Sequence, residues 1–245
     1  MFEQPKYTQN SFNILFPRQK EIRRKANEFE DMLKMQYFQP QIVPVPDDMD
    51  PEVPRIIFGS EHGFSQIIIS QISIVLNASY SPDWQIDISK GRKYLLDRIP
   101  MTFKLLTLLG GIKSYFCGLT TRVKLASAQG DEKILDRLAE TFFKERQREI
   151  NEVQIKTTQV VENRFYSNIT IQNYRLWKYE EPLQGIKPLP QAQAAERGIQ
   201  ITGDFNDRFS FNENADYFSS TDSAKEIIEK GLSEMEKAIN KIKDA

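Results

Sequence analysis

Cysteine and histidine are almost missing from this 245-residue chain, which has one of each, Cys117 and His62. A single cysteine cannot build an internal disulfide framework or a Cys-rich zinc site, and one free thiol is typical of a reducing cytosol. A single histidine excludes mechanisms that need two, and the G-x-S-x-G motif of many serine hydrolases is also absent. We therefore expect neither a His- or Cys-based metal centre nor a cofactor.

An excess of charge of either sign is also lacking, because 33 basic side chains face 34 acidic ones. Proteins that coat nucleic acid usually carry a basic excess, so the balance gives no support to nucleic-acid binding. The N-terminus shows no basic segment followed by an apolar core, and we expect no signal peptide. The longest apolar-leaning stretch, residues 99–112, contains Lys104 and is too short to span a bilayer. These features predict a cytoplasmic protein that does not enter a membrane.

The only histidine lies in "GSEHGFS", residues 59–65, between the β-rich runs "RIIF" and "QIIIS". Glycine supplies the positive φ that tight turns need, so the stretch predicts a hairpin with His62 facing solvent. Cys117 stands between Phe116 and Gly118 and is best interpreted as a small buried apolar residue.

Alternation of polar and apolar residues predicts strands, and apolar residues three and four apart predict helices. Residues 39–54 hold five prolines and form a connector with a short edge strand. Residues 180–197 predict a surface loop, and 198–211 a strand or hairpin. Ser223 and Glu226 have the spacing of a capping box. The last helix, within 219–245, has an apolar seam that favours packing on the same subunit over a coiled coil: Ile228, Leu232, Met235, Ile239 and Ile242.

Runs of adjacent strands between helices predict an α+β fold with largely antiparallel sheets and about four helices. The chain is expected to form a single unit, 1–245, whose two lobes would be residues 1–112 and 113–245. A strand-helix-strands unit around 11–79 recurs, less clearly, around 113–210, which suggests a loose duplication.

Several landmarks together resemble an uncharacterised, sporadically distributed bacterial protein family of similar length. They are the connector ending "PEVPRIIF", the hairpin ending "ISIVLNAS", Tyr80 and Trp84 four residues apart, the strand "CGLTTRVKLA" and the C-terminal helix. The resemblance implies no established activity. The scattered occurrence of the family resembles that of accessory genes associated with antiviral defence.

Acidic residues beside lysines offer the main enzymatic alternative, a Mg²⁺-dependent nuclease. Such a site needs two or more carboxylates and a lysine within a few ångströms. One candidate group is Asp83, Asp87 and Lys90, in 83–90, and the other, in 149–156, is Glu149, Glu152 and Lys156.

Aromatic residues near strand ends or loops offer a candidate binding surface, with ordinary half-buried sheet packing and stacking on single-stranded bases as the alternatives. Arg175, Trp177 and Tyr179 would share one side of a strand, and an arginine beside two aromatics is typical of interfaces. Tyr80 and Trp84 complete the candidate binding residues. We expect a non-catalytic accessory subunit of a larger bacterial assembly, with a protein partner or a second copy of itself. A small-ligand-binding domain is a further alternative.

Overall fold

The computed structural model describes residues 1–60, 62, 64–143, 150–178 and 188–244. The predicted α+β class is confirmed: within these residues, one antiparallel sheet of nine strands accompanies four helices of eight or more residues. These are α1 (Ala26–Leu33), α3 (Ile88–Leu108), α4 (Asp131–Phe142) and α6 (Thr221–Asp244). Shorter turns of helix are η1 (Ile22–Lys25), α2 (Pro82–Gln85), η2 (Gln191–Gln193) and α5 (Arg208–Glu213).

The strands of the two halves follow the same path through the sheet. The order is β2-β3-β4-β5-β1-β6-β9-β8-β7, so β1 and β6 are neighbours at the centre. Outward from them, residues 1–112 supply β5, β4 and β3, and residues 113–245 supply β9, β8 and β7. The strands are β1 (Lys6–Leu15), β2 (Gln41–Ile42), β3 (Ile56–Gly59), β4 (Ser65–Ile69), β5 (Ser73–Ser79), β6 (Phe116–Ala126), β7 (Gln154–Val161), β8 (Phe165–Leu176) and β9 (Glu196–Asn206).

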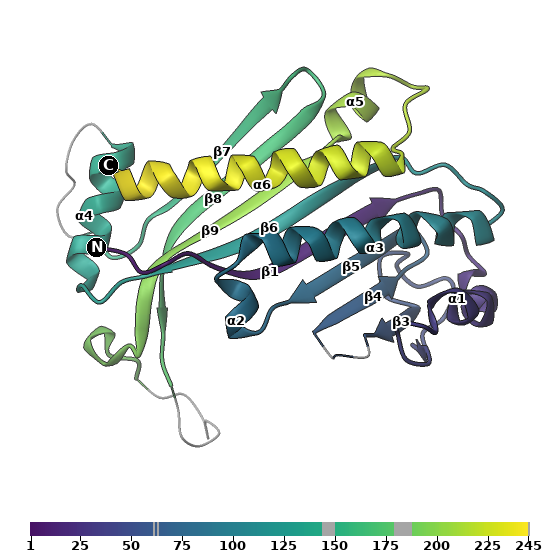
Figure 1. The fold of residues 1–245 in the computed structure, drawn as a ribbon, viewed down its shortest axis with the longest axis horizontal. Helices are drawn as coiled ribbons and strands as arrows, with labels where there is room; N and C mark the ends of the chain where they lie inside the picture. The colour runs from purple at the N-terminus through teal and green to yellow at the C-terminus, as the bar shows by residue number, and fades with distance from the viewer. Residues whose placement is uncertain (61, 63, 144–149, 179–187, 245) are drawn as a thin grey trace.

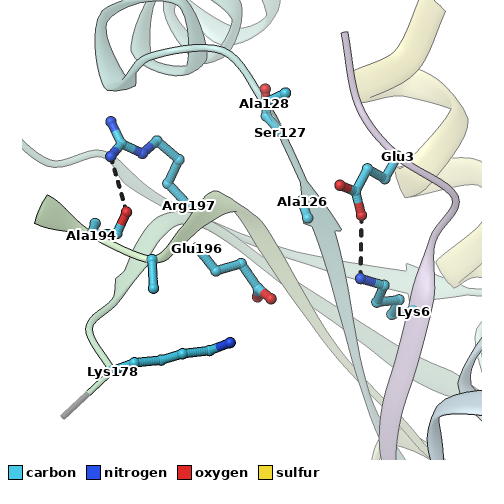
Figure 2. Close-up of a pocket in the computed structure, with 10 residues that line it drawn as sticks. Glu3, Lys6, Ala126, Ser127, Ala128, Lys178, Ala194, Glu196 and Arg197 are labelled. Atoms are coloured by element: carbon cyan, nitrogen blue, oxygen red, sulfur yellow. Dashed lines mark hydrogen bonds and ion pairs between the residues drawn. The ribbon is translucent and has the colours of Figure 1, made fainter. Parts of the chain in front are cut away.

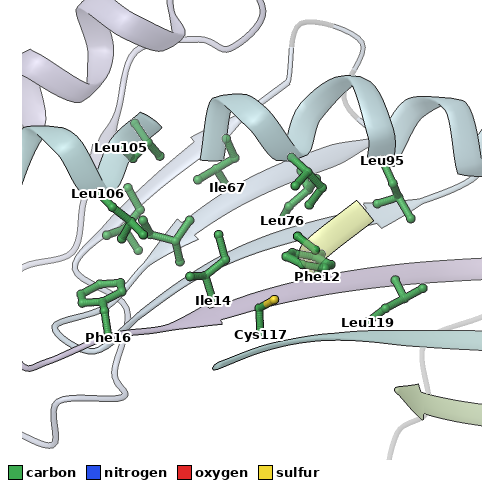
Figure 3. Packing of buried hydrophobic residues seen from close by; sticks show 14 of the residues in the cluster. Phe12, Ile14, Phe16, Ile67, Leu76, Leu95, Leu105, Leu106, Cys117 and Leu119 are labelled. Atoms are coloured by element: carbon green, nitrogen blue, oxygen red, sulfur yellow. The ribbon is translucent and has the colours of Figure 1, made fainter. Parts of the chain in front are cut away.

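The long helices α3 and α6 lie side by side across one face of this sheet (Figure 1). Strand residues that face them are buried, among them Phe12 and Ile14 of β1 and Leu119 of β6. Under α3 they pack with Leu95, Leu105 and other apolar residues in one continuous core (Figure 3). Alternate strand residues point to the opposite face, because side chains along a strand alternate between the two sides. The apolar core therefore lies on the helical side of the sheet.

Helix α6 packs its apolar seam on the sheet of the same subunit, as predicted. The seam is buried, with Ile228, Met235 and Ile242 each 0% exposed. Among the strands, α6 packs mainly on β9. The predicted capping box is wrong, because the helix begins at Thr221 and the hydroxyl of Ser220 accepts the bond from the Ser223 amide at 3.1 Å. Glu226 instead pairs with Arg164 at 2.9 Å.

Two further predictions meet different outcomes. The connector at 39–54 does contain a short edge strand, β2. Residues 198–206 form the predicted strand as part of β9, and the hairpin alternative is wrong because β9 ends at Asn206 and the chain turns into the short helix α5.

A buried arginine holds the proline-rich connector against the body. Arg55 is 0% exposed, and its guanidinium donates to the carbonyl of Val53 at 2.6 Å. It also donates to carbonyls of Pro46, Met49 and Asp50, each at 3.3 Å. The planar fork of donors on arginine suits such a set of backbone oxygens. The connector itself has few N–H groups to pair them, because proline has none.

Asp207, buried at the end of β9, ties together three segments that are distant in sequence. Its carboxylate accepts from the Cys117 amide at 2.7 Å, from the Tyr217 hydroxyl at 2.6 Å, and from the Ser219 hydroxyl. Burial raises the pKa of Asp207, and these donors act in the opposite direction. Cys117 is itself 0% exposed, as predicted, and burial raises the pKa of its thiol. The carboxylate thereby fixes the start of β6 and the segment before α6 to β9.

No helix in the described part of the chain is both long enough and apolar enough to cross a membrane.

Candidate functional site

The sheet face away from the long helices is lined by polar side chains in register, and we call it the open face. Strand pairing places directly opposed residues in rows that cross the sheet. The first row runs over seven strands: Gln66, Asn77, Ser11, Thr120, Asp204, Asn168 and Thr158. The second row contains Ser79, Gln9, Arg122, Thr202, Thr170 and Lys156. Every one of these residues is at least partly exposed.

Hydrogen bonds between neighbouring side chains order part of the open face. Thr158 donates to the Asn168 amide oxygen at 2.8 Å, and the Asn168 amide nitrogen donates to Asp204 at 3.1 Å. On the other half, the Gln9 amide nitrogen donates to the amide oxygen of Asn77 at 2.7 Å. Since short amide and hydroxyl side chains lose little entropy when they bind, a surface of this kind is prepared to form hydrogen bonds.

The two rows contain three charged residues among thirteen, a share close to the 27% of the whole chain. Arg122, Lys156 and Asp204 are the charged members, and the others are amides and hydroxyls. The solvated face of an antiparallel sheet is polar in any case. What distinguishes this face is that directly opposed polar side chains, most of them amides and hydroxyls, continue across seven strands.

Aromatic side chains close the open face at the end where β6 begins. Phe116 and Tyr166 project from β6 and β8 on this side, and α5 packs against both. Phe211 lies 5.6 Å from the Phe116 ring and Phe209 lies 5.5 Å from the Tyr166 ring. The Asp207 carboxylate, one residue before α5, holds this helix in place.

A polar pocket of about 510 Å³ opens at the other end, where β6 ends and β9 begins. Lys6, Lys178 and Glu196 extend into it (Figure 2). Lys6 pairs with Glu3 at 3.2 Å, and Glu196 accepts from the Tyr174 hydroxyl at 2.8 Å. The lining has three basic side chains, Lys6, Lys178 and Arg197, and two acidic ones, Glu3 and Glu196. Arg197 also pairs with Asp131 at 3.5 Å.

Tyr80 and Trp84, predicted as binding residues, form part of a packed aromatic cluster. Their rings are 6.1 Å apart and nearly parallel, and Phe64 and Tyr94 join them. Tyr80 is 5% exposed, and its hydroxyl accepts from the Asn10 amide at 3.0 Å. Trp84 is half-buried. The pair therefore joins α2 and α3 to the sheet, and Tyr80 offers almost no surface to a partner.

Arg175 and Trp177, the other described candidates, lie together near the end of β8 but are held by intramolecular contacts. Arg175 pairs with Asp131 of α4 at 3.0 Å, and the indole of Trp177 donates to the Pro190 carbonyl at 2.9 Å. Tyr179 lies outside the described residues. The structure thus brings together Tyr80 with Trp84 and Arg175 with Trp177, in different halves of the sheet.

The described carboxylates of the nuclease alternative have local hydrogen-bond partners or face solvent. Asp83 accepts from the Ser81 hydroxyl at 2.6 Å, and Asp87 accepts from the Ser89 amide at 3.0 Å at the start of α3. These bonds lower the pKa of both aspartates, first through the serine hydroxyls. Glu149 lies outside the described residues, while Glu152 is exposed. Among described residues no group of three His, Cys, Asp or Glu side chains could hold a metal ion.

The open face was missed by the sequence analysis because its signal is spread over distant strands. Stretches such as "SFNI" and "NITIQ" do alternate amides or hydroxyls with apolar residues. Such alternation predicts a strand with one solvated face, but the rows themselves follow from the strand order.

A scan against protein-family models finds no match for this chain, and searches of curated proteins and of solved structures find none either.

Proposed function

We propose that this protein is a non-catalytic binding subunit that holds a protein partner on its open face, as an accessory component of a larger bacterial assembly. One observation carries the proposal: a row of polar side chains, all but Asp204 neutral amides and hydroxyls, lies in register over seven strands on a face that the long helices leave uncovered.

Preorganisation of the side chains on the open face supports this role. A sheet fixes the spacing of its side chains, so a partner meets donors and acceptors that are already placed and pays little to order them. The rows contain two cations and one anion, Arg122, Lys156 and Asp204, which is too few positive charges for binding driven by phosphate neutralisation. A polar polypeptide surface matches this balance better than a nucleic acid does. The connection to antiviral defence rests on the family resemblance alone.

The test is an affinity purification from the native host with two matched variants. Thr120→Arg with Thr170→Arg places bulk and charge in the middle of the open face. Thr107→Arg with Thr157→Arg makes the same chemical change at exposed threonines on the helical side. We expect one stoichiometric protein to elute with the wild type and with the helical-side variant, and to be lost from the open-face variant.

Retention of the partner by the open-face variant would disprove the location of the site. Elution of nucleic acid in place of a protein would disprove the class of partner. Thermal unfolding of both variants checks that neither loses the fold.

A further inference from the structure

The nine-stranded sheet ends in two edge strands that differ in length and composition. β2, at one edge, has two residues, and Pro40 and Pro44 flank it. Short edges and prolines are means by which proteins prevent another strand from pairing there. β7, at the other edge, has eight residues, pairs with β8 without a register shift and contains neither proline nor glycine (Figure 1). The sheet therefore blocks one of its edges and leaves the other able to accept a strand.

The backbone groups on the outer side of β7 have no partner among the described residues. The Asn173 amide donates to the Val153 carbonyl at 3.3 Å, so Val153 and every second residue after it turn their backbone groups towards β8. The N–H and C=O groups of Lys156, Thr158 and Val160 consequently point to the free edge. The same three residues are exposed to solvent. An edge of this kind can bind an extended strand through main-chain hydrogen bonds.

We propose that β7 pairs antiparallel with the β7 of a second copy of this chain, with a two-fold axis beside Thr158. Two identical antiparallel strands are related by a two-fold axis, so an open edge strand complements itself. Thr158 then faces Thr158, and Lys156 faces Val160 of the other copy. Each opposed pair exchanges two backbone hydrogen bonds, about six in all. That number lies within the range of about 5–15 in protein interfaces, and a contact one strand wide belongs to the small, reversible class.

Charge and overlap select this register over those shifted by one residue. Lys156 is the only charged residue of β7. With the axis beside Thr158, the two lysines are offset by about 13 Å along the strands, which exceeds the Debye length of about 8–10 Å. An axis beside Thr157 would reduce this offset to about 7 Å and increase the repulsion. An axis beside Gln159 would shorten the paired segment. The chosen register also places the aliphatic stem of each lysine over Val160 of the other copy, which is 44% exposed in the single chain.

The pairing extends the open face as well as the sheet. Thr158 ends the first polar row, so the rows of the two copies meet at the axis and continue from one copy into the other. On the helical side, Ile155 lies beside Val161 of the second copy, and both are half-buried in the single chain. The contact uses the edge of the sheet, so it does not depend on the partner proposed for the open face.

Sedimentation equilibrium of the full chain measures dimerisation, and we expect a reversible equilibrium between monomer and dimer. Thr158→Pro removes an N–H that points outward and none that bonds β8. The fold should therefore persist, while dimerisation weakens by about tenfold or more. The sign of a charge at position 160 provides a matched pair of variants. Val160→Glu places a carboxylate opposite Lys156 of the other copy, and Val160→Lys places an ammonium group there. The dissociation constant of Val160→Lys should exceed that of Val160→Glu by about tenfold or more.

A cysteine at the axis tests the register. The Cα atoms of an opposed hydrogen-bonded pair are about 5.5 Å apart, which a disulfide can span. Cys117 is 0% exposed and does not compete for the oxidant. We expect Thr158→Cys to form a disulfide-linked dimer on mild oxidation. Thr107→Cys, at an exposed threonine of α3, is the matched control and should stay monomeric.

A wild type that stays monomeric at its highest soluble concentration would overturn the proposal, as would a dimer that Thr158→Pro leaves intact. If Thr158→Pro does not fold, equal dissociation constants of the two Val160 variants provide the contradiction. Equal cross-linking of Thr158→Cys and Thr107→Cys would overturn the register. A monomeric wild type that binds a different protein, and loses it in Thr158→Pro, would assign the edge to that protein and overturn the second copy as its occupant.

Discussion

Replacing Asp207 with alanine removes the acceptor that joins β6, β9 and the segment before α6. Three donors then lose their partner: the Cys117 amide, the Ser219 hydroxyl and the Tyr217 hydroxyl. Cys117 and Ser219 are 0% and 4% exposed, so water cannot replace the carboxylate there. At about 1–3 kcal/mol for each buried unpaired group, these two donors cost about 2–6 kcal/mol.

Part of that cost is offset, because the buried carboxylate was itself poorly solvated and its pKa is raised. We therefore expect Asp207→Ala to lower the free energy of unfolding by about 2–4 kcal/mol. For a chain of this length that corresponds to a fall in Tm of about 5–15 °C. Asp207→Asn is the control: it keeps the shape, and hydroxyls can turn to meet an amide, so we expect about half the loss. Urea denaturation measures both, and an Asp207→Ala value within about 0.5 kcal/mol of the wild type would refute the reasoning.

Three further predictions follow from single residues. Burial raises the folded-state pKa of Asp207, so the wild type should gain stability relative to Asp207→Asn as pH falls from 7 through that pKa. The gain should level off near pH 3.8, the ordinary pKa of aspartate. A difference in urea midpoints that is constant with pH would contradict this. Gly198→Ala should lower the free energy of unfolding by about 1–3 kcal/mol or more, because the added Cβ would lie 2.1 Å from the Leu125 carbonyl oxygen. In the same thermal melts, Gly59→Ala should stay within about 0.5 kcal/mol of the wild type, because its Cβ would have nothing within 4 Å. Arg55→Met should expose the connector at 39–54 to limited proteolysis and lower the free energy of unfolding by about 2–4 kcal/mol. Arg24→Met removes an exposed ion pair with Glu21 and should leave the cleavage pattern unchanged.

The strands and long helices could be predicted because their patterns are local. The alternation in "SFNILF" and the apolar seam of the last helix each lie within a few turns or strand residues. The hairpin around His62 is equally local, because polar residues and glycine separate two β-rich runs there. Local patterns of this kind determine which elements form and do not determine their neighbours.

The candidate site could not be predicted to the same extent, because it depends on pairing between distant strands. Ser11, Thr120 and Asp204 become neighbours only when β1, β6 and β9 are adjacent. The aromatic residues that drew attention in the sequence have intramolecular partners instead, as Tyr80 does with Asn10. Composition cannot separate an aromatic side chain that packs in the core from one that binds a partner, because both have the same polar neighbours in the sequence.

The two halves share one strand order but cover their outer strands differently. In the first half, Phe29 and Leu33 of α1 are buried in the core that contains β3 and β4. In the second half α4 packs on β9 and α6, and a groove of about 270 Å³ remains over β7 and β8, lined by Ile155 and Ile169 among others. Strand β7 is consequently exposed along most of its length, with a free edge as well. The covered half has a small pocket of about 110 Å³ where the end of α1, the β3–β4 turn and α3 meet. The same strand order has thus produced two halves that differ in how far helices cover their outer strands. The open face, in contrast, is built by both halves together.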